Sequence, residues 1–403
     1  MIRRAVRAVA IGAGLAAVAL VTMIGSLFYH PLPTIDGHFR LLGLNERVEV
    51  IRDAMGVPHL FASDAHDLFF LQGYVTAQDR LTELEQMRLA GRGEMGPAAR
   101  AAVGRASPAL RAALEAYAAG ITKLVAQYAD ARALPGELVL AGDRPAPWEP
   151  ADSLAVAGTY LERIAPSSIC ASAAAARTLK GRPLLAADLY LSAPDPGWYE
   201  IGLDGGGMRM AGLSIPGVPG VVAGHNGWVA WSLLASARGT SDPVRSLDAL
   251  LSALSARSAR TFGDVMRGSA VASCIADVEG RVGGTDRGQV SFVPAERPGV
   301  LGGDGARAAE LGARLGAARA LDVESLRALL GRPLSSAGGG RVIVDLADVD
   351  TSRSAVSRGA SGQRASPHFG DQAALWEIGA LHRLPLSRAA ITLVDGDLVL
   401  RAR

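Results

Sequence analysis

The chain has 403 residues, enough for one large domain or two smaller ones with a substantial core. Its formal net charge of +2 excludes the strongly charged character that indicates nucleic acid or an acidic substrate. Two cysteines, Cys170 and Cys274, exclude a disulfide framework but allow one bridge after export, and no Cys or His spacing indicates a zinc site.

The first 30 residues form a segment of their own. Three arginines within the first seven residues precede an uncharged run from Ala8 to Tyr29. A helix of about 20 apolar residues spans the hydrocarbon core of a bilayer, and a basic flank stays in the cytoplasm. We therefore predict a transmembrane signal anchor at residues 1–30, with the rest on the periplasmic or extracellular side. A cleaved signal peptide, which leaves a secreted protein, is the alternative.

Residues 31–167 are predicted to be mainly helical. Alternating apolar and polar residues over 47–63 predict a strand, a turn and a second strand. Asp64 is expected to cap a helix from about 65 to 89. Ser107 and Pro108 open a second helix that runs to about 127, and an amphipathic stretch over 151–164 predicts a third.

From residue 168 onward, strands and helices alternate in blocks. Short strands broken by Gly and Pro fill 183–234, one helix is predicted over 247–266, and a hairpin is predicted around Glu279 and Gly280. A helical stretch over 305–331 and strands over 340–349 and 389–403 complete the chain. This order indicates a layered α+β fold in which helices cover sheets.

Several motifs, in order along the chain, resemble the penicillin acylase family of N-terminal nucleophile hydrolases. They are VEVIRDAMGVPHLFA at 48–62, LQGYVTAQDRLTELEQMRLAGRGEMG at 71–96, LPGELVLAGDRPAPWEPADSLAV at 134–156, GRPLLAADLYL from 181, IPGVPGVVAGHNGWVAW at 215–231, ADVEGRVGG at 276–284 and ASGQRASPHFGDQAALW at 360–376. The resemblance covers most of residues 34–384. Two family segments are missing: the pro-segment before Ser168, of which only residues 165–167 remain, and a large segment between the predicted helix that ends near 331 and the next strand.

The resemblance implies a four-layer αββα sandwich, here truncated, and a precursor that is cut just before a serine. The freed α-amine then serves as base for the serine hydroxyl, because an α-amine with a pKa near 8 accepts a proton and an amide nitrogen does not. Residues 31–167 become an α-chain-like helical part and 168–403 a β-chain-like part. If cut, the two fragments form a non-covalent heterodimer.

The family register assigns Ser168 as the nucleophile. The family's serine lies a fixed distance before a Gly-Lys/Arg-Pro turn, and counting back from Gly181 gives Ser168, whose α-amine is the expected base. A turn serine is the alternative reading. Cys170, two residues out of register, is either a substitute nucleophile or a small buried thiol. A backbone N–H near Ala235 is the expected oxyanion donor.

Other positions depart from the family pattern. Tyr190 stands where a histidine is frequent, and Ala272 stands where the family has an oxyanion-hole asparagine, so that position is degenerate. Tyr190, His225 and Asn226 are predicted to line the substrate pocket. For His225 and Asn226, a strand-turn role with backbone partners is the alternative.

No metal or other cofactor is expected. Asp242 alone matches the acids of the family's structural calcium loop, and a lone carboxylate binds a hard cation poorly. The expected partners are a small-molecule amide and, through the N-terminal helix, a membrane, with no nucleic acid.

The predicted function is hydrolysis of a linear carbon–nitrogen amide bond by a serine released through autoproteolysis. Family substrates include β-lactam side chains and N-acyl homoserine lactones. One alternative is a catalytically inactive relative that acts as a membrane-anchored binding or structural module. Another is a decayed sequence that folds poorly, because lost layers would expose sheet edges.

Overall fold

The structure is a computed structural model that describes residues 2–29, 37–52, 57–131, 133–164, 168–189, 198–234, 242–269, 271–286, 289–294, 299–302, 305–330, 340–346, 389–394 and 397–402. Its helices are α1 Ile2–Tyr29, α2 Ala65–Val103, α3 Pro108–Ala131, α4 Gly136–Ala141, α5 Pro150–Arg163, α6 Pro243–Ala253, α7 Ala259–Met266, α8 Gly305–Ala317 and α9 Val323–Leu330.

The strands form two sheets. They are β1 Gly37–Arg40, β2 Glu49–Arg52, β3 Pro58–Phe61, β4 Ile169–Ala173, β5 Leu184–Leu189, β6 Tyr199–Gly205, β7 Met208–Ser214, β8 Ala223–His225, β9 Val229–Leu234, β10 Ala272–Asp277, β11 Val282–Asp286, β12 Gln289–Val293, β13 Gly299–Gly302, β14 Gly340–Asp345, β15 Ala389–Val394 and β16 Asp397–Ala402. The large sheet has the order β1-β16-β15-β2-β3-β6-β7-β8-β9-β10-β11-β12, and the small sheet has the order β13-β4-β5-β14.

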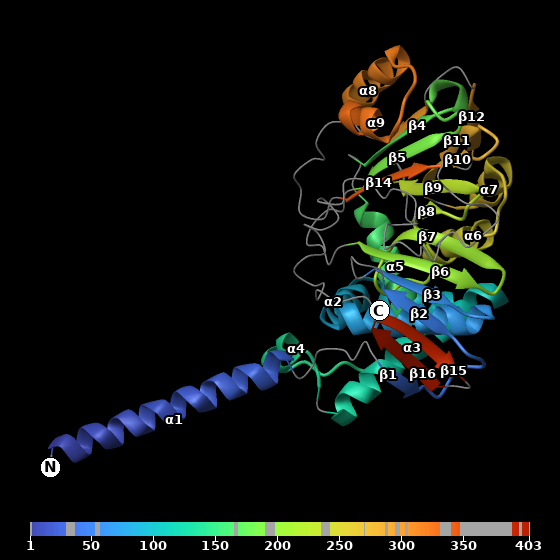
Figure 1. The fold of residues 1–403 in the computed structure, drawn as a ribbon. Helices are drawn as coiled ribbons and strands as arrows, with labels where there is room; N and C mark the ends of the chain where they lie inside the picture. The colour runs from blue at the N-terminus through green and yellow to red at the C-terminus, as the bar shows by residue number, and fades with distance from the viewer. Residues whose placement is uncertain are drawn as a thin grey trace.

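The two sheets pack face to face between helices (Figure 1). On the large sheet, Trp231 of β9 stacks on Phe262 of α7 with ring centroids 5.3 Å apart, so this face is covered by helices. The opposite face meets the small sheet, where Cys170 of β4 is bonded to Cys274 of β10. The outer face of the small sheet packs against α8 and α9. The described residues therefore form helix, sheet, sheet and helix layers, as the resemblance predicted.

Residues before and after Ser168 share the large sheet. β2 and β3 lie between β15 and β6, and β3 pairs with β6 in parallel. A buried polar contact adds to this pairing, because Asp79 of α2 accepts hydrogen bonds from Arg52 at 2.6 and 2.9 Å and from the Tyr199 hydroxyl at 2.6 Å. The helical part predicted for 31–167 thus also contributes strands.

Most predicted elements are confirmed, with two differences in extent. Asp64 caps α2, since its side chain accepts a hydrogen bond from the backbone N–H of Asp67, but the helix runs on to Val103. The stretch over 247–266 is mostly helical, as predicted, but it is divided between α6 and α7. It is two helices, because Ser258 caps a new one by accepting a hydrogen bond from the N–H of Thr261.

Helices α2 and α3 pack with almost no space between their backbones. A Cβ atom on Gly73 would lie 2.1 Å from the carbonyl oxygen of Tyr117, and one on Gly120 would lie 2.0 Å from that of Phe70. Both glycines let the helices approach more closely than any other residue would allow. This contact fixes α2 and α3 as one unit over the large sheet.

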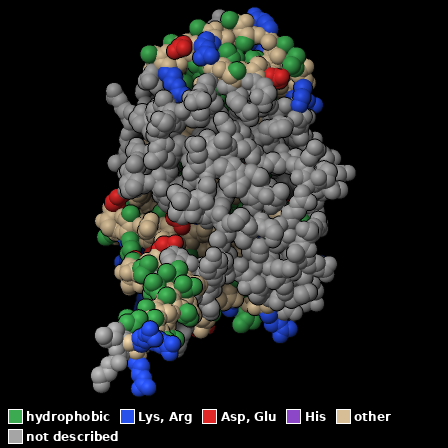
Figure 2. Space-filling model, turned by 60° about the vertical axis from the view of Figure 1, so that its left-hand side comes forward, with side chains coloured by type: hydrophobic (Ala, Val, Ile, Leu, Met, Phe, Trp, Pro, Cys, Tyr) green, Lys and Arg blue, Asp and Glu red, His purple; other side chains and the backbone are tan. Residues whose placement is uncertain are grey.

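The N-terminal segment is helical, as predicted, and α1 extends away from the rest of the molecule (Figure 1). Alanine and glycine fill much of it, and hydrophobic side chains gather at the lower left of Figure 2, where this helix comes toward the viewer. Within the described part of the chain, no helix has the combined length and apolar character of a membrane span. The predicted transmembrane anchor is therefore not supported.

Candidate active site

Ser168 lies at the entrance to strand β4 and is buried, with 1% of its surface exposed. Its neighbour Ile169 pairs with Gly302 of β13 on one side and with Asp188 of β5 on the other. Residues 165–167, which would decide whether Ser168 follows a turn, lie outside the described residues. Ser168 thus begins a central strand of the small sheet.

Gly302 brings Ser168 close to the end of β9. A Cβ atom at Gly302 would lie 2.5 Å from the carbonyl oxygen of Ser168 and 3.5 Å from Cδ1 of Leu234. Gly302 also has a φ of +75°, which side chains other than glycine rarely adopt. Only glycine therefore fits at position 302, where β13 ends between the candidate nucleophile and the large sheet.

Ala272 lies in the same region. It begins β10 and pairs directly with Leu234 of β9, so the two side chains share the face that meets the small sheet. The structure thus brings together Ser168, Leu234 and the position where the family has an oxyanion asparagine. The methyl group of Ala272 supplies no hydrogen-bond donor.

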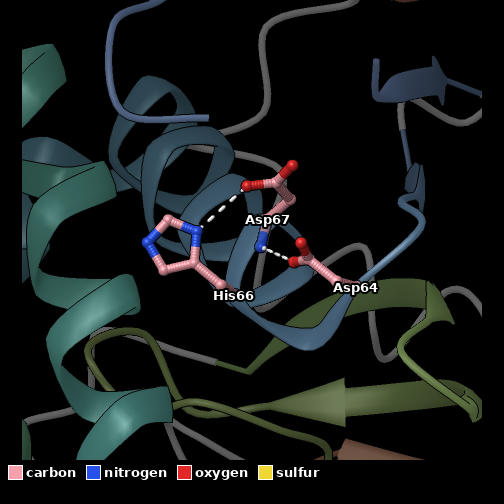
Figure 3. Close-up of side chains that lie close together, drawn as sticks. All are labelled: Asp64, His66 and Asp67. Carbon is pink, nitrogen blue, oxygen red and sulfur yellow. Dashed lines mark hydrogen bonds and ion pairs between the residues drawn. The ribbon is translucent and has the colours of Figure 1, made fainter. Parts of the chain in front are cut away.

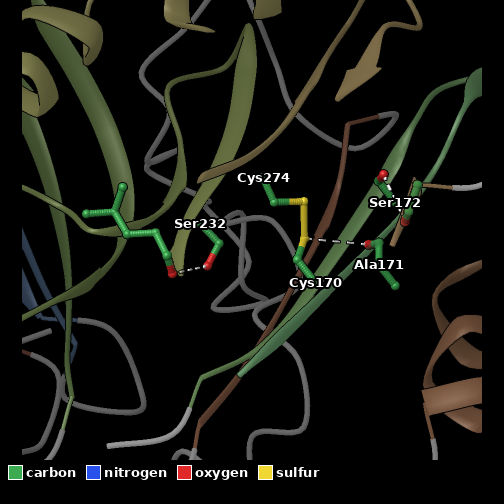
Figure 4. The surroundings of a disulfide bond; sticks show 7 residues. Cys170, Ala171, Ser172, Ser232 and Cys274 are labelled. Atoms are coloured by element: carbon green, nitrogen blue, oxygen red, sulfur yellow. Dashed lines mark hydrogen bonds between the residues drawn. A yellow bond between two sulfur atoms is a disulfide. The ribbon is translucent and has the colours of Figure 1, made fainter. Parts of the chain in front are cut away.

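Cys170 is bonded to Cys274 (Figure 4). Both residues are buried, with 0% and 1% of their surfaces exposed. The bridge that two cysteines allowed is therefore present. The alternative in which Cys170 replaces the serine nucleophile is wrong, because a disulfide sulfur carries no thiolate.

His225 ends β8 and is completely buried. It pairs with Ala230 of β9, and its Nδ1 accepts a hydrogen bond from the N–H of Gly227 at 3.2 Å. Burial lowers the pKa of His225 to about 3, so the ring is neutral at physiological pH. This backbone contact agrees with the strand-turn alternative.

Asn226 uses its side-chain amide to hold surrounding backbone. Nδ2 donates to the carbonyl oxygens of Leu254 and Ala256 at 2.8 and 2.7 Å, and Oδ1 accepts from the N–H groups of Trp228 and Val229 at 3.0 and 2.8 Å. Both amide hydrogens are therefore occupied. These contacts agree with the alternative of a turn former, which ties β8–β9 to the end of α6, and the pocket role of Asn226 stays a prediction.

Two predicted site residues lie outside the described residues. Tyr190 follows Leu189, the last residue of β5, and Ala235 follows Leu234, the last residue of β9. Their assignments as pocket residue and backbone oxyanion donor stay predictions.

A charged pair beside the serine escaped the sequence analysis. Asp188 of β5, opposite Ile169, accepts a hydrogen bond from Nη2 of Arg307 at 3.0 Å. Asp188 is fully buried, so Arg307 offsets part of the cost of placing a carboxylate inside the sandwich. The signal in the sequence was an aspartate inside an apolar strand, but no pattern identifies a partner 119 residues away.

One described group has metal-ligand chemistry: Asp64, His66 and Asp67 lie within reach of a single ion (Figure 3). The carboxylate of Asp67 accepts hydrogen bonds from the N–H groups of Asn45 and Glu46, and that of Asp64 accepts from Asp67 and from the Asn45 amide. These contacts organise the start of α2, far along the sheet from Ser168.

Asp242, the acid considered for calcium, has a structural role. It caps α6 by accepting a hydrogen bond from the N–H of Arg245, and its carboxylate is 3.0 Å from Nη1 of Arg105. The absence of a cofactor stays a prediction.

Two sheets between helix layers, with a buried serine at the start of a strand of the smaller sheet, define the class of N-terminal nucleophile hydrolase folds. Comparison with known families is consistent with this class. The penicillin amidase family matches residues 47–99, 95–167, 160–242 and 333–392, which together cover more than half of the chain. The chain belongs to the penicillin amidase family.

Several characterised proteins are similar to it. Acyl-homoserine lactone acylase QuiP of Pseudomonas aeruginosa is 26% identical over 294 residues, which cover 50% of this chain and 34% of QuiP. Penicillin acylase 2 proenzyme of Pseudomonas sp. (strain SE83) is 33% identical over 145 residues, which cover 31% of this chain and 18% of that protein. Penicillin G acylase of Escherichia coli is 28% identical over 165 residues, covering 35% and 19% of the two chains.

Among solved structures, a tetragonal crystal form of thermostable penicillin G acylase from Alcaligenes faecalis aligns with 28% of this chain and 71% of its own, at 25% identity and a TM-score of 0.26. The match to QuiP extends over about a third of that protein's length.

Proposed function

We propose that the protein hydrolyses a linear amide bond and releases an acyl group, with Ser168 as nucleophile. The observation that carries the proposal is the position of Ser168, which is buried at the entrance to a central strand and whose carbonyl oxygen lies near Gly302, as does Leu234, the partner of Ala272. The names of the similar proteins, acyl-homoserine lactone acylase and penicillin acylase, indicate an N-acylated small molecule as substrate.

The chemistry begins with cleavage of the bond between Ser167 and Ser168, which frees the α-amine. Oγ of Ser168 attacks the amide carbonyl carbon, and its proton passes to the α-amine. The backbone N–H near Ala235 stabilises the oxyanion, and the leaving amine departs with the proton. Water then hydrolyses the acyl-serine ester, so that the enzyme returns to its starting state.

We further propose that the protein works outside the cytoplasm. The buried bridge between Cys170 and Cys274 requires an oxidising compartment, such as the periplasm or the cell exterior. Its proposed partner is a small-molecule amide.

The intact mass of the mature protein tests the nucleophile. Self-cleavage before Ser168 gives two masses, for residues ending at 167 and for 168–403, and Ser168→Ala should leave one uncut chain without activity. Ser172→Ala is the matched control, because Ser172 is an equally buried serine on the same strand. One uncut mass in wild-type protein, unaffected by Ser168→Ala, would contradict the proposal.

A catalytically inactive relative is the second candidate, and Ala272 is the observation that favours it. Loss of one oxyanion donor typically lowers the rate about 100- to 1,000-fold. This candidate predicts a cooperative thermal transition, no self-cleavage and no turnover of N-acyl homoserine lactones or phenylacetyl amides. Hydrolysis that disappears in Ser168→Ala would exclude it.

A further inference from the structure

The disulfide joins the two sheets close to the candidate active site. Cys170 lies on β4 of the small sheet and Cys274 lies on β10 of the large sheet, with their Cα atoms 6.3 Å apart (Figure 4). The two cysteines are 104 residues apart in the chain. The bridge is thus a covalent link across the interface between the two sheets.

The spacing on both strands places the bridge one step from the site. Cys170 follows Ser168 by two residues, and Cys274 follows Ala272 by two residues. Because side chains alternate between faces of a strand, positions 168 and 170 share one face, and positions 272 and 274 share one face. The bridge therefore links β4 to β10. It lies two residues after Ser168 on one strand and two residues after Ala272 on the other.

The residues around the bridge combine small side chains with leucines: Leu301 of β13 pairs with Cys170, and Leu185 and Leu234 face the same interface. The small buried residues that face the interface between the two sheets include Ala187 of β5, Ala230 and Ser232 of β9, and Ala276 of β10. Small side chains bury little apolar area, so they contribute little to holding two sheets in register. A covalent bond at this point adds to the apolar contact that the leucines supply.

Cleavage before Ser168 would make this restraint necessary. Ser168 would become a chain terminus, and termini fray unless they are tied down. Ile169 is paired with β13 and β5 within the small sheet, and the bridge at Cys170 ties the same strand to the large sheet.

We infer that the disulfide between Cys170 and Cys274 is a positioning element that holds the first residues of β4 against β10 and so keeps Ser168 beside Leu234 and Ala272. This inference rests on the proposed function of Ser168 for its catalytic consequence. Its structural content, the restraint on β4, is independent of catalysis.

The test compares wild-type protein with the double variant Cys170→Ala/Cys274→Ala. Both sulfurs are buried, so variants are a cleaner test than a reducing agent. We expect amide hydrogen exchange at Ile169–Ala171 to be at least about tenfold faster relative to exchange in the other strands of the protein. We expect kcat to fall at least about tenfold with KM unchanged, since displacement of the nucleophile weakens catalysis more than binding.

Leu185→Ala is the matched control. Leu185 is fully buried on β5 and faces the same interface between the two sheets. Its truncation therefore lowers stability without breaking the bridge. The control should speed exchange in all strands alike and leave kcat close to wild type below the melting temperature. If the double variant does not fold, Cys170→Val/Cys274→Ala provides a better-filled replacement.

The outcomes separate the two proposals. If amide hydrogen exchange in the cysteine variant becomes faster by the same factor in all strands, as expected for the control, the positioning role would be overturned. If wild-type protein stays uncut and inactive, the proposed function fails, and exchange at Ile169–Ala171 in the uncut chain still decides whether the bridge restrains β4. Selective exchange together with a lower kcat supports both.

Discussion

At position 272 a single methyl group stands where the family carries an amide. Ala272 pairs with Leu234, and Leu234 and Ser168 approach the same glycine, Gly302, so the position lies in the region of the proposed nucleophile. An asparagine there would add an N–H donor toward the developing oxyanion. Under the proposed function, residue 272 thus decides whether a side-chain donor is available to the oxyanion.

Ala272→Asn is expected to raise kcat by about 100- to 1,000-fold, the usual value of one oxyanion donor. Hydrolysis of an N-acyl homoserine lactone or a phenylacetyl amide measures it. Ala272→Asp is the control, because aspartate has nearly the same size as asparagine but its ionised side chain donates no hydrogen bond. An equal gain from both substitutions would show that the donor is not the cause.

His225 makes stability depend on pH. Burial gives it a pKa of about 3 in the folded state against 6.5 for the free side chain, so the unfolded state binds more protons between these values. The free energy of unfolding is therefore not lowered by His225 above pH 6.5. Below that pH it decreases as the pH falls toward 3, by at most about 1.4 kcal/mol per pH unit from this group.

Thermal melting between pH 7 and pH 4 tests this dependence. His225→Gln should flatten the slope, because glutamine keeps an acceptor for the N–H of Gly227 and does not titrate. Ser214→Ala is the control, because Ser214 is also buried but carries no titrating group, so the slope should stay unchanged. An unaltered slope in His225→Gln would rule out His225 as its origin.

At the scale of elements, the contact between α2 and α3 depends on two glycines. Gly73→Ala is expected to destabilise the protein by about 1–3 kcal/mol, because its Cβ would lie 2.1 Å from the carbonyl oxygen of Tyr117 and the helices would have to separate. Urea unfolding measures this change.

Gly93→Ala on the same helix is the matched control for Gly73→Ala. Nothing lies within 4 Å of a Cβ at Gly93, so alanine should be neutral or stabilise by up to about 1 kcal/mol through helix propensity. Equal destabilisation by both substitutions would contradict close packing as the reason for Gly73.

At the scale of the whole molecule, cleavage before Ser168 would leave two fragments joined without a covalent bond. Both cysteines follow Ser168, so the disulfide stays within residues 168–403. The fragments would instead be held by the parallel pairing of β3 with β6 and by the hydrogen bond that the Tyr199 hydroxyl donates to Asp79.

We therefore expect one species in native size-exclusion chromatography and two bands on a denaturing gel, with or without reducing agent. Asp79→Ala should weaken the association, because it removes the acceptor of the Tyr199 hydroxyl, which lies on the other fragment. Fragments that separate only after reduction would show that the predicted connectivity is wrong.

Local signals in the sequence predicted much of this protein. Asp64, Pro108 and the apolar periodicity between them predicted helices, the turn at Gly280 predicted a hairpin, and ordered motifs predicted the family and the layer order. These signals act over a few residues, or over motifs long enough to be recognised, and therefore need no knowledge of distant contacts.

Tertiary structure alone decided which distant residues meet. It paired Cys170 with Cys274, Arg307 with Asp188 and Ala272 with Leu234, and it assigned Asn226 to backbone carbonyls around the end of α6. It also gave no support to a membrane-spanning helix among the described residues. Sheet stacking brings together segments about 100 residues apart, and strand periodicity specifies which face a residue occupies but not which residue it will meet there.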